Sequence, residues 1–103
     1  MQHEVHANPA VRTRRAFPFV VELQADVAGE GRRRLIAPLA PAGTMGTVPG
    51  RLLPIVRYAE RDFHVVVELI ASWPLTALRR PLGSVASYRY EITRALDWLF
   101  TGV

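Results

Sequence analysis

The segment from residue 84 to residue 103 most constrains the fold, because it has the clearest helical period in the chain. Its apolar side chains recur mainly every three or four residues, which places them on one stripe of an α-helix. Ser84 or Ser87 can cap the start of this helix, and Gly102 stands where a helix usually ends. We therefore predict a C-terminal amphipathic helix that packs this stripe on the rest of the protein. The stripe consists of Val85, Tyr88, Ile92, Ala95, Leu96 and Leu99.

The residues before this helix show the period of two that is typical of β-strands. Apolar residues occupy every second position of 17–27, so we expect a strand with one apolar and one largely polar face. A turn at 29–31 and a return strand from residue 32 complete a predicted hairpin. Pro54 favours an edge position for one further strand, and valine on both faces favours a central position for another. These further strands are predicted at 2–6, 52–58 and 63–70.

The segments between these strands are predicted to be connections. Residues 38–50 carry prolines and glycines but no charge, so we expect a loop that packs against the body of the protein. Residues 60–62 are expected to form a turn. We expect residues 71–74 to break the preceding strand and residues 75–78 to add a short one. Residues 79–83 then lead into the helix.

This order of elements predicts a single domain, residues 1–103, of mainly β structure. Several antiparallel strands followed by one helix form a small sheet or barrel with the helix laid across it. A chain of 103 residues can bury enough surface for one core. The absence of cysteine excludes disulfides and suits a reducing cytoplasm. We expect no membrane partner, because there is no apolar run of about 18 residues.

Arginine accounts for all 13 basic residues, against 9 acidic residues. This modest excess permits a nucleic-acid partner but does not require one. A polar loop contains Arg12, Arg14 and Arg15, where exposure to solvent is the usual state of a charged residue. The run at 32–34 is the best candidate anion site, although an exposed strand end explains it as well. Because neighbouring strand residues face opposite sides, at most two of these three side chains can act together.

Candidate catalytic and metal-binding residues are few. His3 and His6 are three residues apart on a predicted strand, so we expect them on opposite faces and predict no metal site and no cofactor. Glu22 and Asp26 lie about 13 Å apart along a strand at about 3.3 Å per residue, too far for a carboxylate pair. No serine lies in a nucleophile-elbow pattern, so we predict no catalytic residue. An acid–base set for RNA cleavage would have to come from Asp26, Arg32, Arg33 and His64.

Two aromatic residues near the end of the helix are candidates for partner binding. Trp98 and Phe100 flank Leu99 and cannot both share its apolar stripe. At least one of them is expected to be exposed or at an interface. Large aromatic side chains in such positions are frequent anchors of protein complexes.

Short segments along the whole chain resemble toxins of the CcdB family. No single segment is specific, but their order and spacing agree with that family from one end of the chain to the other. The segments are MQ at 1–2, VELQADV at 21–27, GRR at 31–33, PL at 38–39, LPIV at 53–56, IASWP at 70–74, EITRAL at 91–96 and FTGV at 100–103.

The resemblance implies an SH3-like barrel of the CcdB/MazF toxin type and a homodimer. It also implies a toxin that binds the A subunit of DNA gyrase and traps the cleaved DNA complex without catalysis. A CcdA-type antitoxin would neutralise it, and Arg32 and Arg33 are the candidate antitoxin contacts. The pair would bind operator DNA only through the antitoxin complex, regulate its own transcription and serve in plasmid maintenance. The alternatives are a MazF-like ribonuclease toxin and an inactive relative that only binds antitoxin.

The last three residues differ from the pattern of the family that they resemble. Members usually end in tryptophan, glycine and isoleucine, whereas this chain ends in Thr101, Gly102 and Val103. The resemblance makes these three residues, with Trp98 and Phe100, the candidate gyrase-binding site. Threonine lacks the large stacking surface of tryptophan, so we expect gyrase poisoning to be weakened, absent or redirected. Trp98 is three residues before Thr101 and near the same helix face, so it is expected to replace part of that contact.

Overall fold

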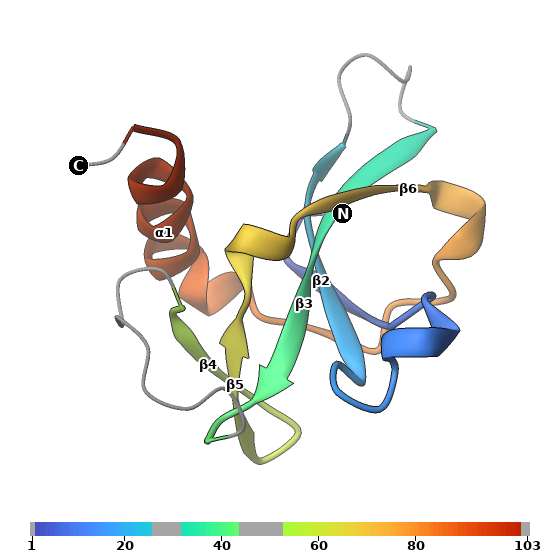
Figure 1. Cartoon of the computed structure of the whole chain (residues 1–103), viewed down its shortest axis with the longest axis horizontal. Coiled ribbons are helices and arrows are strands. Elements are labelled where there is room, and N and C mark those ends of the chain that lie inside the picture. The colour runs from blue at the N-terminus through green and yellow to red at the C-terminus, as the bar shows by residue number, and fades with distance from the viewer. Residues whose placement is uncertain (1, 26–31, 44–52, 102–103) are drawn as a thin grey trace.

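The computed structural model describes residues 2–25, 32–43 and 53–101 (Figure 1). Within these residues the protein has one seven-stranded antiparallel sheet and one α-helix, which confirms the predicted fold class. The sheet is barrel-like and nearly closed, with α1 at its side. The strands are β1 (Glu4–Ala7), β2 (Phe19–Ala25), β3 (Arg33–Pro41), β4 (Ile55–Tyr58), β5 (Arg61–Val65), β6 (Ala71–Pro74) and β7 (Gly83–Ser84); the helix is α1 (Arg89–Thr101).

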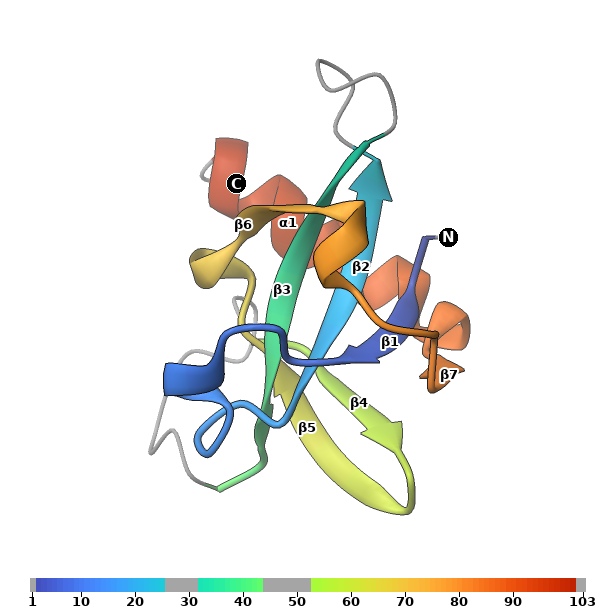
Figure 2. The same cartoon turned by 90° about the vertical axis from the view of Figure 1, so that its right-hand side faces the viewer.

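Strand β3 organises the sheet. It pairs with β2 along one side, as the predicted hairpin requires, and with both β5 and β6 along the other. The strand order is β4-β5-β3-β2-β1-β7, with β6 attached to β3 (Figures 1 and 2). Strand β4 is at the edge, as Pro54 predicted, and β5 lies between β4 and β3. The register of β2 and β3 shifts between Glu22 and Gln24, and such a bulge bends the strand.

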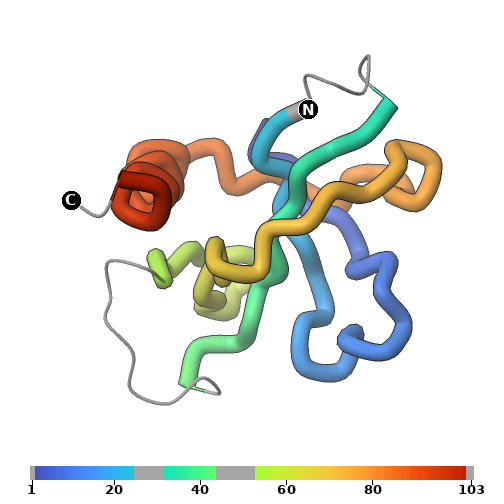
Figure 3. Tube along the Cα trace, turned by 45° about the horizontal axis from the view of Figure 1, so that its top comes forward, coloured from blue at the N-terminus to red at the C-terminus, as the bar shows by residue number. Residues whose placement is uncertain are grey.

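Residues 61–74 form one long strand that is interrupted by a 3-10 turn at Val67–Leu69. Leu39 pairs with Val65 and Ile36 with Ala71, so three steps along β3 correspond to six along its partner. The three extra residues bulge towards α1, which lies beside this turn (Figure 3). Val67 is completely buried there. The prediction of a continuous strand at 63–70 that breaks at 71–74 was therefore wrong, since the strand resumes at Ala71.

Pro38 explains why residues 38–41 belong to β3 rather than to the predicted loop. Its carbonyl accepts a 2.9 Å hydrogen bond from the backbone nitrogen of Val66, just where the partner strand is interrupted. The nitrogen and oxygen of one strand residue point to the same side, so the missing N–H of Pro38 also faces this gap. Proline is tolerated in a sheet at such a position. Residues 42 and 43 form a turn, as predicted, and the remainder of the predicted loop, residues 44–50, lies outside the described residues.

Other predicted connections are also corrected by the structure. Residues 75–77 form a 3-10 turn instead of a strand. The turn between β4 and β5 consists of Ala59 and Glu60, which have φ of 52° and 64°, so Arg61 and Asp62 belong to β5. Two successive left-handed residues match the twist of a tight hairpin. Neither residue is the asparagine or glycine that usually signals this turn. The predicted turn at 29–31 lies outside the described residues.

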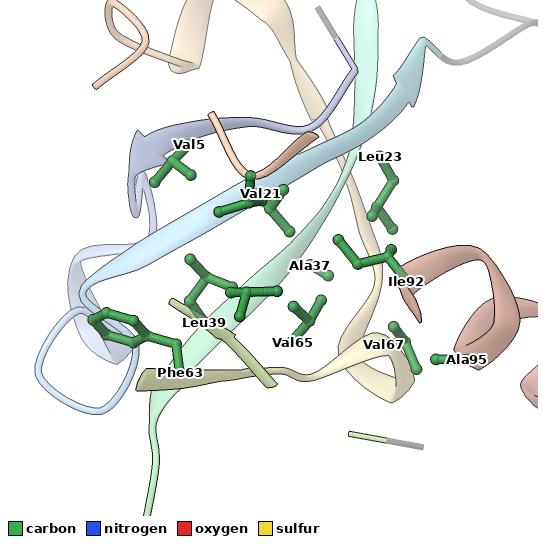
Figure 4. Close-up of a cluster of buried hydrophobic side chains, with 12 residues drawn as sticks. Val5, Val21, Leu23, Ala37, Leu39, Phe63, Val65, Val67, Ile92 and Ala95 are labelled. Carbon is green, nitrogen blue, oxygen red and sulfur yellow. The ribbon is translucent and has the colours of Figure 1, made fainter. Parts of the chain in front are cut away.

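The main core lies between the sheet and α1, and it buries the predicted stripe, but α1 begins at Arg89 and not at the predicted start near Ser84, so Val85 and Tyr88 precede the helix. Ile92 and Ala95 point from α1 towards Leu23 and Val67 (Figure 4). Tyr88, Leu96 and Leu99 are half-buried against the same cluster. A 3-10 turn precedes the helix, and Ser84 Oγ accepts a 3.1 Å hydrogen bond from the Ala86 nitrogen at its start. No helix among the described residues is long and apolar enough to cross a membrane.

Candidate functional sites

The last turn of α1 exposes one of the two candidate aromatic residues. Leu96 and Leu99 hold the helix on the core, while Phe100 is 73% exposed. Trp98 is half-buried, so the expectation that at least one of the pair is exposed is confirmed by Phe100. Thr101 is exposed, and its Oγ1 donates a 2.6 Å hydrogen bond to the Asp97 carbonyl, one turn earlier. Gly102 and Val103 lie outside the described residues.

A pocket of about 350 Å³ lies beside Phe100, and we call it the helix pocket. Its walls are mainly apolar and come from β2, β3, the segment before β6 and the second half of α1. A concave apolar surface next to an exposed aromatic ring is typical of a protein-binding site. The lining residues are Gln2, His3, Leu23, Gln24, Leu35, Ile70, Thr93, Leu96, Asp97 and Phe100.

His3 closes one end of the helix pocket with a left-handed backbone. Its φ is 67°, a conformation that few residues other than glycine, asparagine and histidine adopt. The backbone is held from both sides, because its nitrogen donates to the Glu22 carbonyl and its oxygen accepts from the Val85 nitrogen. Burial and the positive charge of Arg89 lower the pKa of His3 below its usual value. The imidazole therefore stays uncharged at neutral pH.

The three arginines that follow the predicted turn have three different environments. The Nε of Arg34 lies 2.6 Å from Glu22 Oε1, inside the protein. The Nε and Nη2 of Arg33 donate hydrogen bonds of 2.8 Å to the hydroxyl and carbonyl oxygens of Ser72. Arg32 is exposed. This confirms that the three side chains do not act as one anion site, and it leaves Arg32 and Arg33 on the surface.

A second pocket, of about 250 Å³, lies where β6 meets the loop after β1, and we call it the Trp73 pocket. It is almost entirely apolar, and no charged side chain lines it. Arginines flank it, because Arg12, Arg14 and Arg15 are exposed on the loop while Arg33 is bound to Ser72 beside Trp73. The three loop arginines are therefore exposed to solvent, as expected from the sequence. The lining residues are Asn8, Ala10, Thr13, Phe17, Val20, Ile36, Pro38, Leu69, Ala71 and Trp73.

A polar cluster is buried between β1 and β2. Glu4, His6 and Glu22 each offer a ligand atom, and these atoms lie within 4.8 Å of one another. His6 is 4% exposed and Glu22 is 2% exposed, so the face of β2 that was predicted to be largely polar is covered at Val20 and Glu22 and exposed only at Gln24. Burial alone would raise the pKa of Glu22. Hydrogen bonds with the N-terminal amino group and His6, together with the positive charges of that amino group and Arg34, outweigh burial and hold the pKa of Glu22 below its usual value.

The comparison with known families identifies the fold. The family described as "CcdB protein" matches residues 2–102. The chain belongs to the CcdB family. Members of this family are toxins of toxin–antitoxin modules. The matched residues include all the described residues and therefore both pockets.

The CcdB assignment is consistent with the separation of the residues considered for RNA cleavage. His64 pairs with Ala40 on β3, seven residues after Arg33, which is roughly 23 Å at about 3.3 Å per residue. The His64 Nδ1 also binds the Leu53 carbonyl at 3.1 Å. Arg33 and His64 therefore do not share one site within a protomer. Asp26 lies outside the described residues.

Sequence reasoning missed the polar cluster because it paired His6 with His3. It assumed that both lie on one strand, whereas β1 begins at Glu4 and His3 has a left-handed backbone. The available signal was the spacing of Glu4 and His6 at alternate positions, which puts their side chains on one face of a strand. Pairing that face with Glu22 requires the register of β1 and β2, which the sequence does not specify.

Proposed function

We propose that this CcdB-family toxin binds the A subunit of DNA gyrase with the end of α1 and traps the cleaved gyrase–DNA complex. The proposal rests mainly on Phe100, a large apolar side chain that is 73% exposed beside the helix pocket. Such a side chain gains most when a partner buries it, and a few residues of this kind dominate many interfaces. The mechanism needs only binding, with no catalytic residue and no cofactor, and it acts in the bacterial cytoplasm, where gyrase and DNA are found.

The proposed gyrase-binding residues are the final ones of the chain and the two aromatic side chains before them. Phe100 is the main anchor, because it is exposed at the mouth of the pocket. Thr101 replaces the usual tryptophan, and its hydroxyl is already engaged with the Asp97 carbonyl. We propose that half-buried Trp98 adds aromatic surface beside it. The remaining members of the site are Gly102 and Val103.

A homodimer fits this mode of action. Gyrase offers a two-fold symmetric target, and a two-fold dimer presents two identical helix ends to it. Each protomer would contribute one Phe100. The affinity for gyrase then depends on both helix ends binding together. A substitution in the chain is present in both protomers, so it removes the same contact at each helix end.

We propose that a CcdA-type antitoxin occupies the Trp73 pocket with an acidic, disordered segment. The pocket offers apolar walls, and Arg33, which is bound to Ser72 beside Trp73, together with its exposed neighbour Arg32 complements an acidic chain. The guanidinium of Arg33 is already oriented by Ser72, so its remaining N–H groups can bind a carboxylate with little loss of freedom. Disordered segments cover large surfaces in this way. Operator binding and autoregulation would then belong to the complex.

One assay separates the possible activities. The purified protein is incubated with gyrase, supercoiled DNA and ATP, and in parallel with RNA. Linear DNA after denaturation supports gyrase poisoning. RNA fragments without DNA cleavage would instead establish a ribonuclease. The absence of both, together with tight antitoxin binding, would identify an inactive relative and overturn the proposal.

A further inference from the structure

We propose that one side of the barrel binds the phosphate backbone of duplex DNA, independently of its sequence. The binding groups are five exposed arginines, which we call the arginine cluster. They lie in the loop after β1 and in the segment before β7, on the side of the sheet away from α1 (Figures 1 and 2). No member of the cluster lines either pocket. The cluster consists of Arg12, Arg14, Arg15, Arg79 and Arg80.

Exposed charges are distributed unevenly over the described residues. The segments 2–25, 32–43 and 70–88 carry seven exposed arginines and no exposed acidic residue. The other described segments, 53–69 and 89–101, carry four exposed arginines and five exposed acidic residues. The positive charge is therefore concentrated on the part of the barrel that carries the arginine cluster. A surface of one sign without neighbouring opposite charges attracts an anionic polymer.

The two segments that supply the cluster are both attached to β1 or to the residue after it. His6 Nδ1 lies 2.7 Å from the carbonyl oxygen of Arg79. The carbonyl oxygen of Asn8 accepts a 2.9 Å hydrogen bond from the Nε of Arg14. His6 and Asn8 are only two residues apart, which is at most about 7 Å along an extended chain. The two groups of arginines therefore form one continuous surface, and their backbones are held in place without a partner.

Most guanidinium groups of the cluster are available for binding. Among the described contacts, none engages the side chains of Arg12, Arg15, Arg79 or Arg80. Arg14 uses its Nε for the Asn8 carbonyl, and its Nη groups make no described contact. A guanidinium group is permanently charged and matches the geometry of a phosphate group with two parallel hydrogen bonds. Duplex DNA carries one negative charge per about 1.7 Å of its axis, so several of these arginines can each reach a phosphate.

Duplex DNA fits this surface better than an acidic protein segment does. Protein partners are held mainly by a few large side chains in pockets, and the arginine cluster lines no pocket. The DNA backbone requires only positive charge and hydrogen-bond donors. Because the cluster lies away from α1, DNA can bind while the end of the helix contacts another protein (Figure 1). In the proposed operator complex, the toxin would then contribute DNA contacts of its own.

The test measures fluorescence anisotropy of a labelled duplex of about 20 base pairs with the purified protein, from about 0.05 to 0.2 M salt. Each phosphate contact adds about 0.9 to the slope of log Kd against log salt, so we expect a slope of about 4 for the wild type. Arg79→Gln combined with Arg80→Gln should lower this slope by about 1.8. Arg57→Gln combined with Arg61→Gln is the matched control, because it removes the same charge from the hairpin of β4 and β5. The control should keep the wild-type slope, and duplexes of shuffled sequence should bind equally well.

Three results would overturn the DNA-binding surface. The first is no binding of the duplex by the wild type at about 0.05 M salt. The second is an equal slope in the two double variants, which would assign binding to net charge. The third is a labelled polyglutamate peptide that binds more tightly than the duplex and is released by the Arg79 and Arg80 substitutions, which would indicate an acidic protein partner.

Two features keep the test independent of other properties of the protein. Arg12→Gln combined with Arg15→Gln should lower the slope by the same amount, so the test does not depend on the folding of one variant. The assay contains no gyrase and no antitoxin. Its result is therefore separate from the outcome of the gyrase-cleavage assay.

Discussion

The ring of Tyr58 in β4 lies directly against Gly83 in β7, so the two edge strands of the sheet meet at a glycine. A Cβ atom at residue 83 would be only 2.7 Å from a Tyr58 ring carbon. Phe19 packs edge-on against the same ring, with centroids 5.4 Å apart. At this point the barrel is closed by the packing of the Tyr58 ring against the backbone of Gly83.

Gly83→Ala should destabilise the protein by roughly 1–3 kcal/mol, the usual cost of overpacking a well-packed site. Urea denaturation measures this change. In a Tyr58→Ala background the added methyl group has space, so the same substitution should cost much less. Equal costs in the two backgrounds would show that the close approach to Tyr58 does not determine the choice of glycine.

Phe100→Ala should abolish most gyrase poisoning while leaving the fold intact. Loss of an anchor worth about 2 kcal/mol weakens binding about 30-fold, measured as the toxin concentration that gives half-maximal DNA cleavage. Tyr90→Ala is the control, because Tyr90 is 65% exposed on the same helix but does not line the helix pocket. Equal losses in both variants would count against a specific role of Phe100. Trp98→Ala should reduce poisoning less, and unchanged toxicity would remove Trp98 from the site.

Arg34→Gln should destabilise the protein by roughly 2–4 kcal/mol, because it removes one of the positive partners of a buried carboxylate. Arg57→Gln should cost no more than about 1 kcal/mol, since the pair of Arg57 with Asp62 at 3.1 Å is exposed. Comparison of the two unfolding midpoints in urea measures the difference. If Arg34→Gln were as mild as Arg57→Gln, Glu22 would be compensated sufficiently by its other neighbours.

Stability should decrease below about pH 6.5 through His3. Its pKa is lower in the folded protein than in the unfolded chain, so the unfolded chain binds the proton first as the pH falls. The contribution of His3 is therefore complete above the unfolded pKa and is lost towards the lower folded pKa. His3→Asn tolerates the left-handed backbone and does not titrate, so its unfolding midpoint should fall less between about pH 7.5 and pH 5.5 in chelator-containing buffer. An identical decrease in the variant would assign the effect to other groups.

Arg33→Gln should weaken binding of the acidic antitoxin segment by about tenfold, since it removes a hydrogen bond to a charged group. Fluorescence titration of a labelled antitoxin peptide at two salt concentrations measures both the affinity and its dependence on salt. Arg57→Gln removes the same charge from β4, which lies away from the Trp73 pocket, and should have little effect. If both variants behave alike, net charge rather than the Trp73 pocket governs the interaction.

The sequence predicts those parts of the fold that follow from local periodicity. The stripe of α1 and the hairpin of β2 and β3 were predicted correctly, because apolar side chains repeat with the period of each element. The strand of residues 61–74 was misread, since the turn at Val67–Leu69 depends on contacts with α1 and on the proline opposite it in β3. Those contacts join residues that are far apart in the chain.

In the candidate sites, too, features that follow from local periodicity were predictable, and features that depend on contacts between distant residues were not. Exposure of an aromatic residue near the end of α1 was predictable, because Trp98 and Phe100 cannot both occupy the stripe. The burial of Glu22 was not, because a charged residue at an alternate strand position normally faces water. Groups that are distant in the sequence, among them Arg34 from β3 and His6 from β1, make that position suitable for a carboxylate.

The helix pocket is lined by residues 2 and 3 and by residues of the segment 93–100, so one part of its wall is translated first and another part last. A nascent chain that still lacks α1 has neither Phe100 nor the helical wall of the pocket. A ribosome must therefore translate nearly all of residues 2–100 before the proposed gyrase-binding surface exists. The toxin would pass through most of its synthesis in a harmless state, and an antitoxin made at the same time would have that interval in which to accumulate.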